Sequence, residues 1–371
     1  MGYQLEQVKI SGFQLFSVIF LFELGSAILI GMASDAKQDA WIAVIMGGLI
    51  GCLLYLVYLK LSKMYPSMHL TLYLQKILGR NLGWVFGLIY VIYFIYIASR
   101  VLRDFEELLV IAAYRSSSLV TIGLIMVGCV MYAAYKGLEV FFRISELCLF
   151  IIGIMFLLLI IFEITSGIVK LHHLVPILEN GWKPVFNALP SALTIPFGEM
   201  ITFTMLLPYL NKQEKAKKVG IFAIGLSGFI LLLFTLINIA ITGADIASRS
   251  AFPILTAVSY INIADFVQRL DTVVIICMVL LGFVKITVFF FCAMIGTADL
   301  FRIKQPKKLI YPMGITVLVS SIIMAPGYIA HIYEGVKLVP LYLHLPLQVG
   351  VPIFLLIISL IKLKVTRAIK A

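Results

Sequence analysis

Long apolar runs separated by short polar stretches occupy this chain from one end to the other. A helix of about 20 apolar residues spans the hydrocarbon core of a bilayer. Of the 371 residues, 62% are hydrophobic and only 13% are charged, whereas soluble domains are about half apolar. The sequence therefore predicts an all-α integral membrane protein. Its ten predicted transmembrane helices are residues 10–34, 40–63, 81–110, 118–135, 140–165, 184–209, 218–242, 266–299, 309–326 and 339–361.

The basic residues are distributed unevenly over the predicted loops. With a cytoplasmic N-terminus, the inner loops and ends carry about twice as many lysines and arginines as the outer ones. Positive residues are enriched on the cytoplasmic side of membrane proteins. Both termini are therefore predicted to be cytoplasmic, and the net charge of +11 marks contact with membrane lipids, not nucleic acid. The basic loop at 211–218 is expected to contact anionic headgroups.

No catalytic or metal-binding pattern is present in the sequence. The five cysteines are scattered through apolar runs without paired spacing, and they are expected to be small core residues. The chain contains no phosphate-binding loop, no zinc-protease motif and no nucleophile elbow. We therefore expect no enzyme activity, no catalytic residue, no metal and no cofactor.

Two of the predicted helices carry the same defect at membrane depth. Residues 22–27 (FELGSA) in the first and 196–199 (PFGE) in the sixth each combine an acid with helix-weakening residues. Such residues are costly in hydrocarbon, where no water satisfies the freed backbone groups. They are tolerated mainly where they line a cavity, so the two breaks predict a binding site.

The two halves of the chain resemble each other in layout. Segments 1 and 6 are broken, segments 3 and 8 are the longest, and the connections after segments 2 and 7 are both long. We expect a single membrane domain, 1–371, built as an inverted five-plus-five repeat of about 1–168 and 183–371, with discontinuous helices 1 and 6 meeting near the midplane. The alternative is an irregular bundle whose glycines serve close helix contacts.

The chemistry of the two breaks suits a zwitterion such as an amino acid. A break near Gly25 and Ser26 would free N–H groups for a carboxylate. The carbonyls around 193–196 would accept from an ammonium group. Glu23 and Glu199 lie beside the breaks, and each is either a partner of the ligand or proton, or a structural acceptor for its own break.

Lys285 lies in the middle of the eighth segment with apolar residues on both sides. A central lysine costs about 2.5–3.5 kcal/mol on insertion scales, so it should face the bundle interior and pair with a carboxylate or with carbonyls. We expect its ammonium between segments 1 and 8, where related transporters hold sodium. The alternative is a lysine whose stem reaches toward the membrane interface.

The third segment carries polar-tipped residues at helical spacing. Tyr93 or Tyr96 is expected to face the cavity, although such spacing more often reflects packing. Further along, two i,i+4 pairs are expected to neutralise each other where the helix leaves the bilayer, Arg100 with Asp104 and Arg103 with Glu107.

Three short sequences and the ten-segment layout together resemble one known family. They are residues 10–15 (ISGFQL), 23–26 (ELGS) and 196–199 (PFGE). The chain resembles the spore germination permease family, the B-type membrane subunits of nutrient germinant receptors, within the amino acid, polyamine and organocation transporter superfamily. The resemblance implies residence in the spore inner membrane, an A-type membrane subunit and a C-type lipoprotein as partners, and binding of a small nutrient, commonly an amino acid.

The resemblance also implies which positions line the ligand. They are Gly25, Ser26, Ala27, Tyr96, Phe197, Gly198, Glu199 and Thr287. The expected function is that of a receptor subunit in which a germinant selects a closed arrangement of the bundle and triggers germination. Two alternatives remain open: a proton-coupled amino acid permease using the same pocket, and a structural scaffold or passive water pathway.

Overall fold

Helices make up the regular structure of this computed structural model, which describes residues 9–261 and 270–370. The described residues contain no β pairing beyond one isolated bridge between Ile10 and Leu210. The α-helices are α1 (Gly12–Ile30), α2 (Ala40–Met64), α3 (Leu70–Leu78), α4 (Arg80–Ala112), α5 (Leu119–Lys136), α6 (Leu138–Thr165), α7 (Lys183–Thr194), α8 (Ala216–Thr242), α9 (Ala244–Arg249), α10 (Pro253–Val258), α11 (Asp271–Phe301), α12 (Ile310–Ile323), α13 (Tyr328–Tyr333) and α14 (Val351–Lys370). The 3-10 helices are η1 (Ser34–Asp39), η2 (Leu171–Leu174), η3 (Phe197–Met205), η4 (Leu207–Tyr209), η5 (Gln213–Lys215) and η6 (Pro306–Leu309), and η7 (Glu334–Leu338) and η8 (Pro340–Gly350) are π-helical.

Local sequence sets the ends of several helices. Ser11 caps α1 by a reciprocal pair of bonds: its Oγ accepts from the N–H of Gln14 at 3.1 Å, and its own N–H donates to the Gln14 side chain at 2.9 Å. Gly137 alone joins α5 to α6 and has a φ of +96°. Glycine adopts this conformation without steric cost, which permits a one-residue turn.

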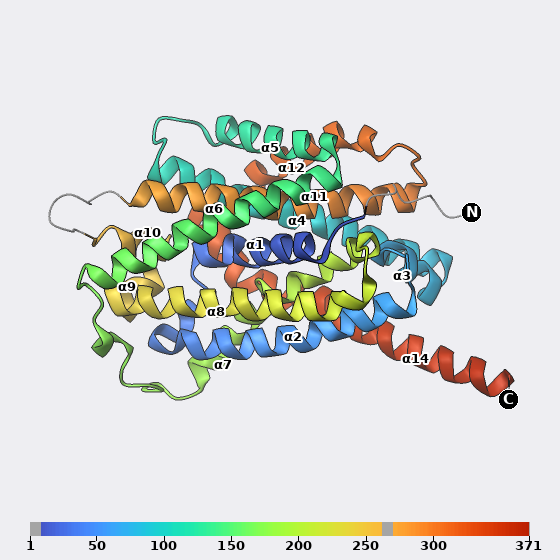
Figure 1. The fold of residues 1–371 in the computed structure, drawn as a ribbon, viewed down its shortest axis with the longest axis horizontal. Helices are drawn as coiled ribbons and strands as arrows, with labels where there is room; N and C mark the ends of the chain where they lie inside the picture. Colours follow the sequence, from blue (N-terminus) through green and yellow to red (C-terminus); the bar gives the residue numbers. More distant parts are fainter. Residues whose placement is uncertain (1–8, 262–269, 371) are drawn as a thin grey trace.

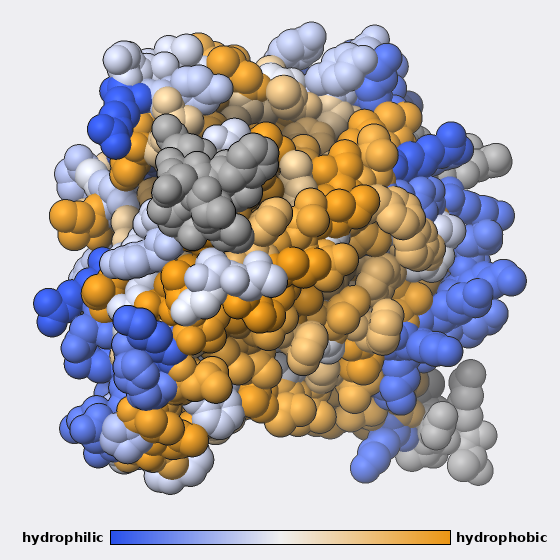
Figure 2. Space-filling view, turned by 60° about the vertical axis from the view of Figure 1, so that its left-hand side comes forward, coloured by the Kyte–Doolittle hydropathy of each residue, from blue (hydrophilic) through white to orange (hydrophobic). Residues whose placement is uncertain are grey.

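On the face shown in Figure 2, apolar residues form a broad band between two more polar ends. Among the described residues, eight helices are long and apolar enough to cross a membrane, and the bent pair formed by 306–323 and 328–338 would make nine. The predicted segment 184–209 lies outside this set because it is broken into α7 and η3. The count of ten therefore stays a prediction, and residues 262–269, where the eighth segment was expected to begin, lie outside the described residues.

Successive helices run back and forth, so that α1 begins and α14 ends at the same end of the bundle (Figure 1). We call this end, which also carries α3, the terminal end, and the other the opposite end. The inner helices are α1, α11 and α4. In the most apolar 18-residue stretch of each, 78%, 67% and 61% is buried inside the protein, against 28% in α6. These three helices thus form the centre of the bundle, while α6 presents most of its surface to lipid.

Both predicted breaks are present. Gly25 has a non-helical backbone (φ 0°, ψ −119°) inside α1, and α7 ends at Thr194, two residues before Pro196. The last span, Pro340–Val365, begins one residue after the predicted start at 339. Helical turns precede it from Tyr328, and the wide π turns of η7 and η8 join the two parts. Pro340 and Pro346 lie within η8, and a proline removes one backbone donor from the helical ladder.

Close packing of α8 against α2 generates a stability prediction. A Cβ on Gly220 would overlap the ring of Tyr55, a fully buried side chain whose hydroxyl donates to the Ala216 carbonyl at 2.8 Å. A Cβ added to Gly225 in the same helix would have nothing within 4 Å. Gly220→Val should lower the free energy of unfolding in detergent by about 1–3 kcal/mol, as overpacking does, and Gly225→Val should not. Equal losses in the two variants would contradict this packing.

Candidate functional site

The break in α1 lies directly against α11. A Cβ on Gly25 would overlap the stem of Lys285, so only glycine allows this approach. Ser26, the next residue, is 4% exposed and begins the short second half of α1. The interior position predicted for Lys285 is confirmed, since its side chain is fully buried; the alternative, a stem reaching toward the interface, does not match the structure.

The second break is packed between α2 and η8. A Cβ on Gly51 of α2 would overlap Phe197, which is fully buried. A Cβ on Gly198 would overlap the amide oxygen of Gln348. The Tyr58 hydroxyl lies 3.2 Å from the carbonyl oxygen of Gly198 and 2.6 Å from that of Gln348. The broken backbone is therefore held by side chains from two other elements.

Three charged side chains gather where the two breaks approach α11. The Lys285 Nζ lies 2.5 Å from Oε2 of Glu199, and both side chains are buried. The same nitrogen lies 5.1 Å from the centre of the Phe22 ring, within the range of a cation–π contact. Glu23 is fully buried, and neither of its carboxylate oxygens has a hydrogen-bond partner among the described residues. Glu199, not Glu23, is thus the direct partner of the lysine.

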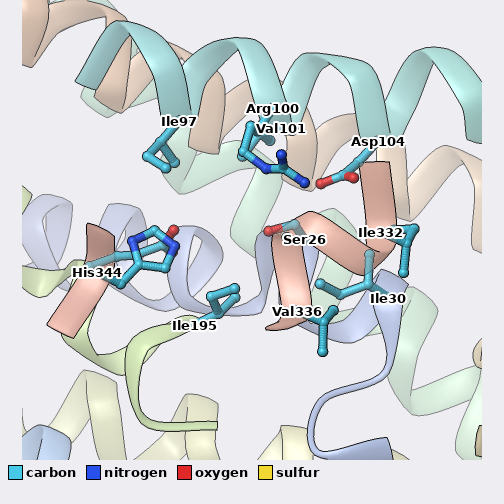
Figure 3. Close-up of a pocket in the computed structure, with 12 residues that line it drawn as sticks. Ser26, Ile30, Ile97, Arg100, Val101, Asp104, Ile195, Ile332, Val336 and His344 are labelled. Carbon is cyan, nitrogen blue, oxygen red and sulfur yellow. The ribbon is translucent and has the colours of Figure 1, made fainter. Parts of the chain in front are cut away.

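A small cavity borders both breaks. Figure 3 shows Arg100 and Asp104 of α4 beside Ser26 and the residues of α13 and η7. The residues around it are Ser26, Ile30, Ile97, Arg100, Val101, Asp104, Ile195, Glu199, Ile332, Gly335, Val336 and His344. Its volume of about 30 Å³ holds about one or two waters. We call α13 with η7, residues 328–338, the lid, because three of its residues, Ile332, Gly335 and Val336, line one side of the cavity.

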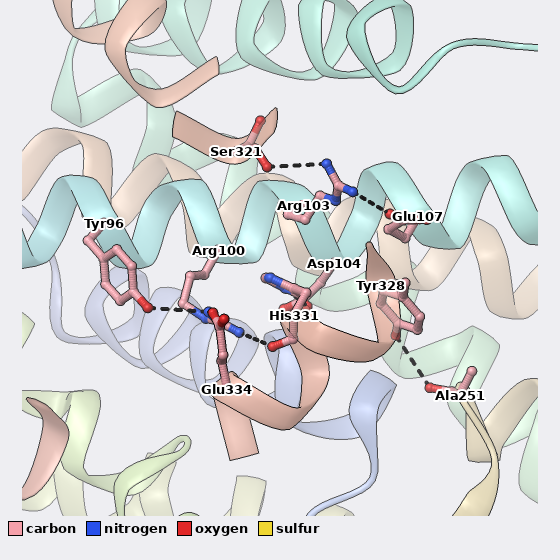
Figure 4. A network of polar contacts seen from close by, with 10 residues as sticks. All are labelled: Tyr96, Arg100, Arg103, Asp104, Glu107, Ala251, Ser321, Tyr328, His331 and Glu334. Atoms are coloured by element: carbon pink, nitrogen blue, oxygen red, sulfur yellow. Dashed lines mark hydrogen bonds and ion pairs between the residues drawn. The ribbon is translucent and has the colours of Figure 1, made fainter. Parts of the chain in front are cut away.

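Arg100 connects α4 to the lid (Figure 4). Its Nη1 donates to the Tyr96 hydroxyl at 3.2 Å, its Nη2 donates to the His331 carbonyl, and it lies 3.7 Å from a Glu334 carboxylate oxygen. The Nε2 of His331 lies 2.7 Å from Oδ1 of Asp104. Two side chains of one α4 turn thus hold the lid through a backbone carbonyl, an imidazole and a carboxylate.

The predicted charge pairing of α4 is partly wrong. Arg103 and Glu107 pair as expected at 2.8 Å. Arg100 instead pairs with Glu334, and Asp104 pairs with His331. These α4 side chains lie inside the bundle, at most 11% exposed, and not where a helix leaves the bilayer. The i,i+4 spacing reports only partners on the same helix, whereas the partners here come from residues more than 200 positions away.

The remaining predicted ligand residues are placed near the cavity but not on its wall. The hydroxyl of Tyr93 lies 2.7 Å from Nδ1 of His344 and accepts from Gln348 at 2.8 Å. Thr287 donates to the Phe283 carbonyl of its own helix at 2.6 Å. Gly25, Ala27, Phe197 and Gly198 are buried beside the breaks. Of the predicted set, Ser26 and Glu199 line the cavity; the ligand roles of the whole set stay predictions.

Sequence reasoning missed the lid and His344 as parts of the cavity. A usable signal was the position of Arg100 and Asp104, which lie well inside a helix of 33 residues and therefore require interior partners. Within the described part of the chain, no group of three or more histidines, cysteines or acids is arranged to hold a metal ion.

Residues 9–329 match the family model described as spore germination protein. The chain is 39% identical to Spore germination protein KB of Bacillus subtilis (strain 168), with 97% of each chain covered. It is 24% identical to Spore germination protein A2 of the same organism, with 91% of this chain and 94% of that protein covered.

Solved structures show the same fold at low sequence identity. MhsT in complex with L-phenylalanine matches with a TM-score of 0.71 at 13% identity, over 92% of this chain and 88% of that chain. Mhp1, a nucleobase-cation-symport-1 family transporter, matches with a TM-score of 0.65 at 12% identity, over 89% and 75%. These transporters are built from inverted repeats, and the predicted fold class is confirmed. The repeat limits of about 1–168 and 183–371 stay a prediction.

The buried charges generate a second stability prediction. Lys285→Met should lower the free energy of unfolding in detergent by about 3–5 kcal/mol, because it leaves the Glu199 carboxylate buried without its cation. The double variant Lys285→Met with Glu199→Gln should lose clearly less, because position 199 then carries no unpaired charge. A double variant as unstable as the single one would show that the ion pair is not what links these residues.

Proposed function

Because the chain belongs to the spore germination protein family, we propose that it is the membrane subunit of a nutrient germinant receptor, which binds a small germinant and triggers germination. It is a multi-pass membrane protein, and its family and fold are those of permeases and transporters, not of enzymes. One observation carries the proposal: both helix breaks border one buried cavity that also contains a guanidinium and a carboxylate.

An amino acid is the germinant class that this cavity favours. Arg100 and Ser26 offer donors to a carboxylate, and Glu199 and Asp104 offer acceptors to an ammonium group. Charges of both signs on one small cavity suit a zwitterion better than a neutral sugar or a simple ion. The solved structure of MhsT, which shares the fold, holds L-phenylalanine, and this supports the same class of ligand here.

The cavity has to enlarge before a germinant can enter, because about 30 Å³ is far below the 300–1,000 Å³ of small-molecule pockets. The lid is the element that moves. A germinant carboxylate competes with the His331 carbonyl and with Glu334 for Arg100, which loosens the lid from α4. The germinant thus binds the loosened arrangement more tightly, instead of the closed arrangement expected from the sequence, and only such a difference in affinity shifts the population.

Lys285 and the two glutamates act as the charge-coupling group beside the pocket. The Lys285 ammonium lies beside Glu199 and the Phe22 ring of α1, and this position supports the role of a built-in cation in the place of a bound sodium ion. Glu199 belongs both to this ion pair and to the cavity wall. A germinant ammonium that approaches Glu199 therefore perturbs the pair, and the change reaches α1 and α11.

The receptor assignment includes partners and a location. We place the chain in the spore inner membrane with both termini cytoplasmic, in a complex with an A-type membrane subunit and a C-type lipoprotein. Its relatives of similar length are named spore germination proteins, and the terminal end carries the lysine-rich connections before α8 and α12. Both facts support this assignment.

A proton-coupled amino acid permease is the second candidate. The shared fold with transporters and the buried Lys285–Glu199 pair favour it. In that case the same pocket would open alternately to both sides, and the charge pair would take up and release a proton during each cycle. The receptor requires only a change of shape.

Sustained uptake separates the two functions. The purified chain is placed in liposomes under a proton gradient and supplied with labelled L-phenylalanine, then with the other standard amino acids. A receptor should bind at most one labelled molecule per chain and should not accumulate the amino acid inside the liposomes. Spores that lack the chain should lose their response to one nutrient and regain it on complementation. Gradient-driven accumulation would support the permease, and a normal nutrient response without the chain would overturn the receptor assignment.

Substitutions of the two side chains in the ion pair between α4 and the lid, Arg100 and Glu334, should change germinant affinity in opposite directions. Glu334→Gln removes a weak ion pair, worth up to about 1 kcal/mol, that holds the lid closed, so the germinant Kd should fall up to about fivefold. Arg100→Gln should raise the Kd tenfold or more. The variant loses the charge-assisted hydrogen bond to the germinant carboxylate, and this loss outweighs the gain from releasing the lid. The measurement is a thermal shift of the purified chain against the standard amino acid that stabilises it most. Parallel changes in the two variants would contradict the competition for Arg100.

A further inference from the structure

A second cavity lies at the terminal end, apart from the germinant site. Its volume is about 370 Å³, and it shares no lining residue with the smaller cavity. It is bordered by the start of α3, the turn at Gly137, the last turns of α11 and the 3-10 helix η6. A volume of this size is within the range of small-molecule pockets.

A buried imidazole faces this cavity with one nitrogen unused. His69 lines the cavity and is 4% exposed, and its Nδ1 lies 2.9 Å from Oδ2 of Asp299. A carboxylate only accepts hydrogen bonds, so Nδ1 carries the proton of this bond. The same Asp299 oxygen accepts from the Thr71 hydroxyl at 2.6 Å. The Nε2 of His69 is buried and has no hydrogen-bond partner among the described residues.

The cavity is cationic at its mouth and apolar along its wall. Lys304, Lys307 and Lys308 border it, and among the described residues that line it Asp299 is the one acid, already engaged by His69 and Thr71. Its apolar wall is made mostly of α11 side chains, among them Phe291 and Met294, together with Leu138 at the start of α6. Lysines at the mouth attract an anion, and the apolar wall suits a hydrocarbon chain.

We propose that this cavity binds the phosphoryl group of an anionic phospholipid, with the lysines on the phosphate and an acyl chain along the α6–α11 wall. Basic pockets between transmembrane helices recognise such headgroups. The Nε2 of His69 bonds the headgroup: it accepts from a hydroxyl when neutral and donates to a phosphate oxygen when protonated. Inorganic phosphate offers the same group, but it would leave the apolar wall and most of the volume empty.

The site is tested by lipid retention on the purified full-length chain. Native mass spectrometry with dioleoyl phosphatidylglycerol and dioleoyl phosphatidylcholine should show about tenfold tighter retention of the anionic lipid. The triple variant Lys304→Ala, Lys307→Ala, Lys308→Ala should lose this preference. The matched control, Lys60→Ala, Lys63→Ala, Lys76→Ala, removes the same charge from exposed positions of α2 and α3 that do not line the cavity and should keep it.

A conservative change at His69 separates the site from general attraction to lysines. His69→Asn keeps a donor toward Asp299 but removes the group at the Nε2 position, so phosphatidylglycerol retention should fall several-fold while the unfolding temperature stays near that of the wild type. A parallel titration with radiolabelled inorganic phosphate identifies the source: saturable binding that the triple lysine variant abolishes would support a free-phosphate ligand of the same site. Equal retention of both lipids together with no phosphate binding, or equal losses in the two triple variants, would overturn the proposal.

Discussion

The ion pair between Lys285 and Glu199 is the interaction on which the centre of the bundle depends. It joins α11 to the turns that follow the second break, and the lysine stem passes over the first break at Gly25. A buried cation is tolerated only with a nearby anion. The ion pair therefore fixes how α1, η3 and α11, which are distant in sequence, lie relative to one another. Without the pair, neither break would have a fixed neighbour, and the cavity between them would lose its shape.

The sequence was sufficient to predict the features that are costly in hydrocarbon. Glycine and proline at membrane depth marked both breaks, and a lysine far from any helix end required an interior partner; the structure contains both. The sequence could not show that Lys285 pairs with Glu199 and not with Glu23, because this pairing depends on how η3 is oriented after the break. Arg100 was assigned to a local pair because helical spacing identifies neighbours on one helix, whereas Glu334 reaches it only through the packing of the lid.

The molecule has two polar interior regions with different partners. Beside the two helix breaks, charges of both signs surround a cavity with room for one or two waters, which a lid closes through Arg100. At the terminal end, a larger cavity carries three lysines and an apolar wall, and its acid, Asp299, is engaged by His69 and Thr71. A shared fold leaves function open, since transporters of the same architecture move their ligand through the bundle. In the receptor assignment, a local change at the lid is sufficient, provided that α1 and α11 respond to it.

The π-helical winding of η7 and η8 has a mechanical consequence for the last helix. A π turn contains an extra residue relative to an α turn, and such turns occur mostly at functional positions. Rewinding one of them as an α turn rotates the preceding segment by about 100° and shifts it by about 1.5 Å along the axis, without unfolding it. The last helix can therefore rotate about its own axis at η8. Arg100 contacts Glu334 on one side of η8, and α14 continues from the other side toward the terminal end.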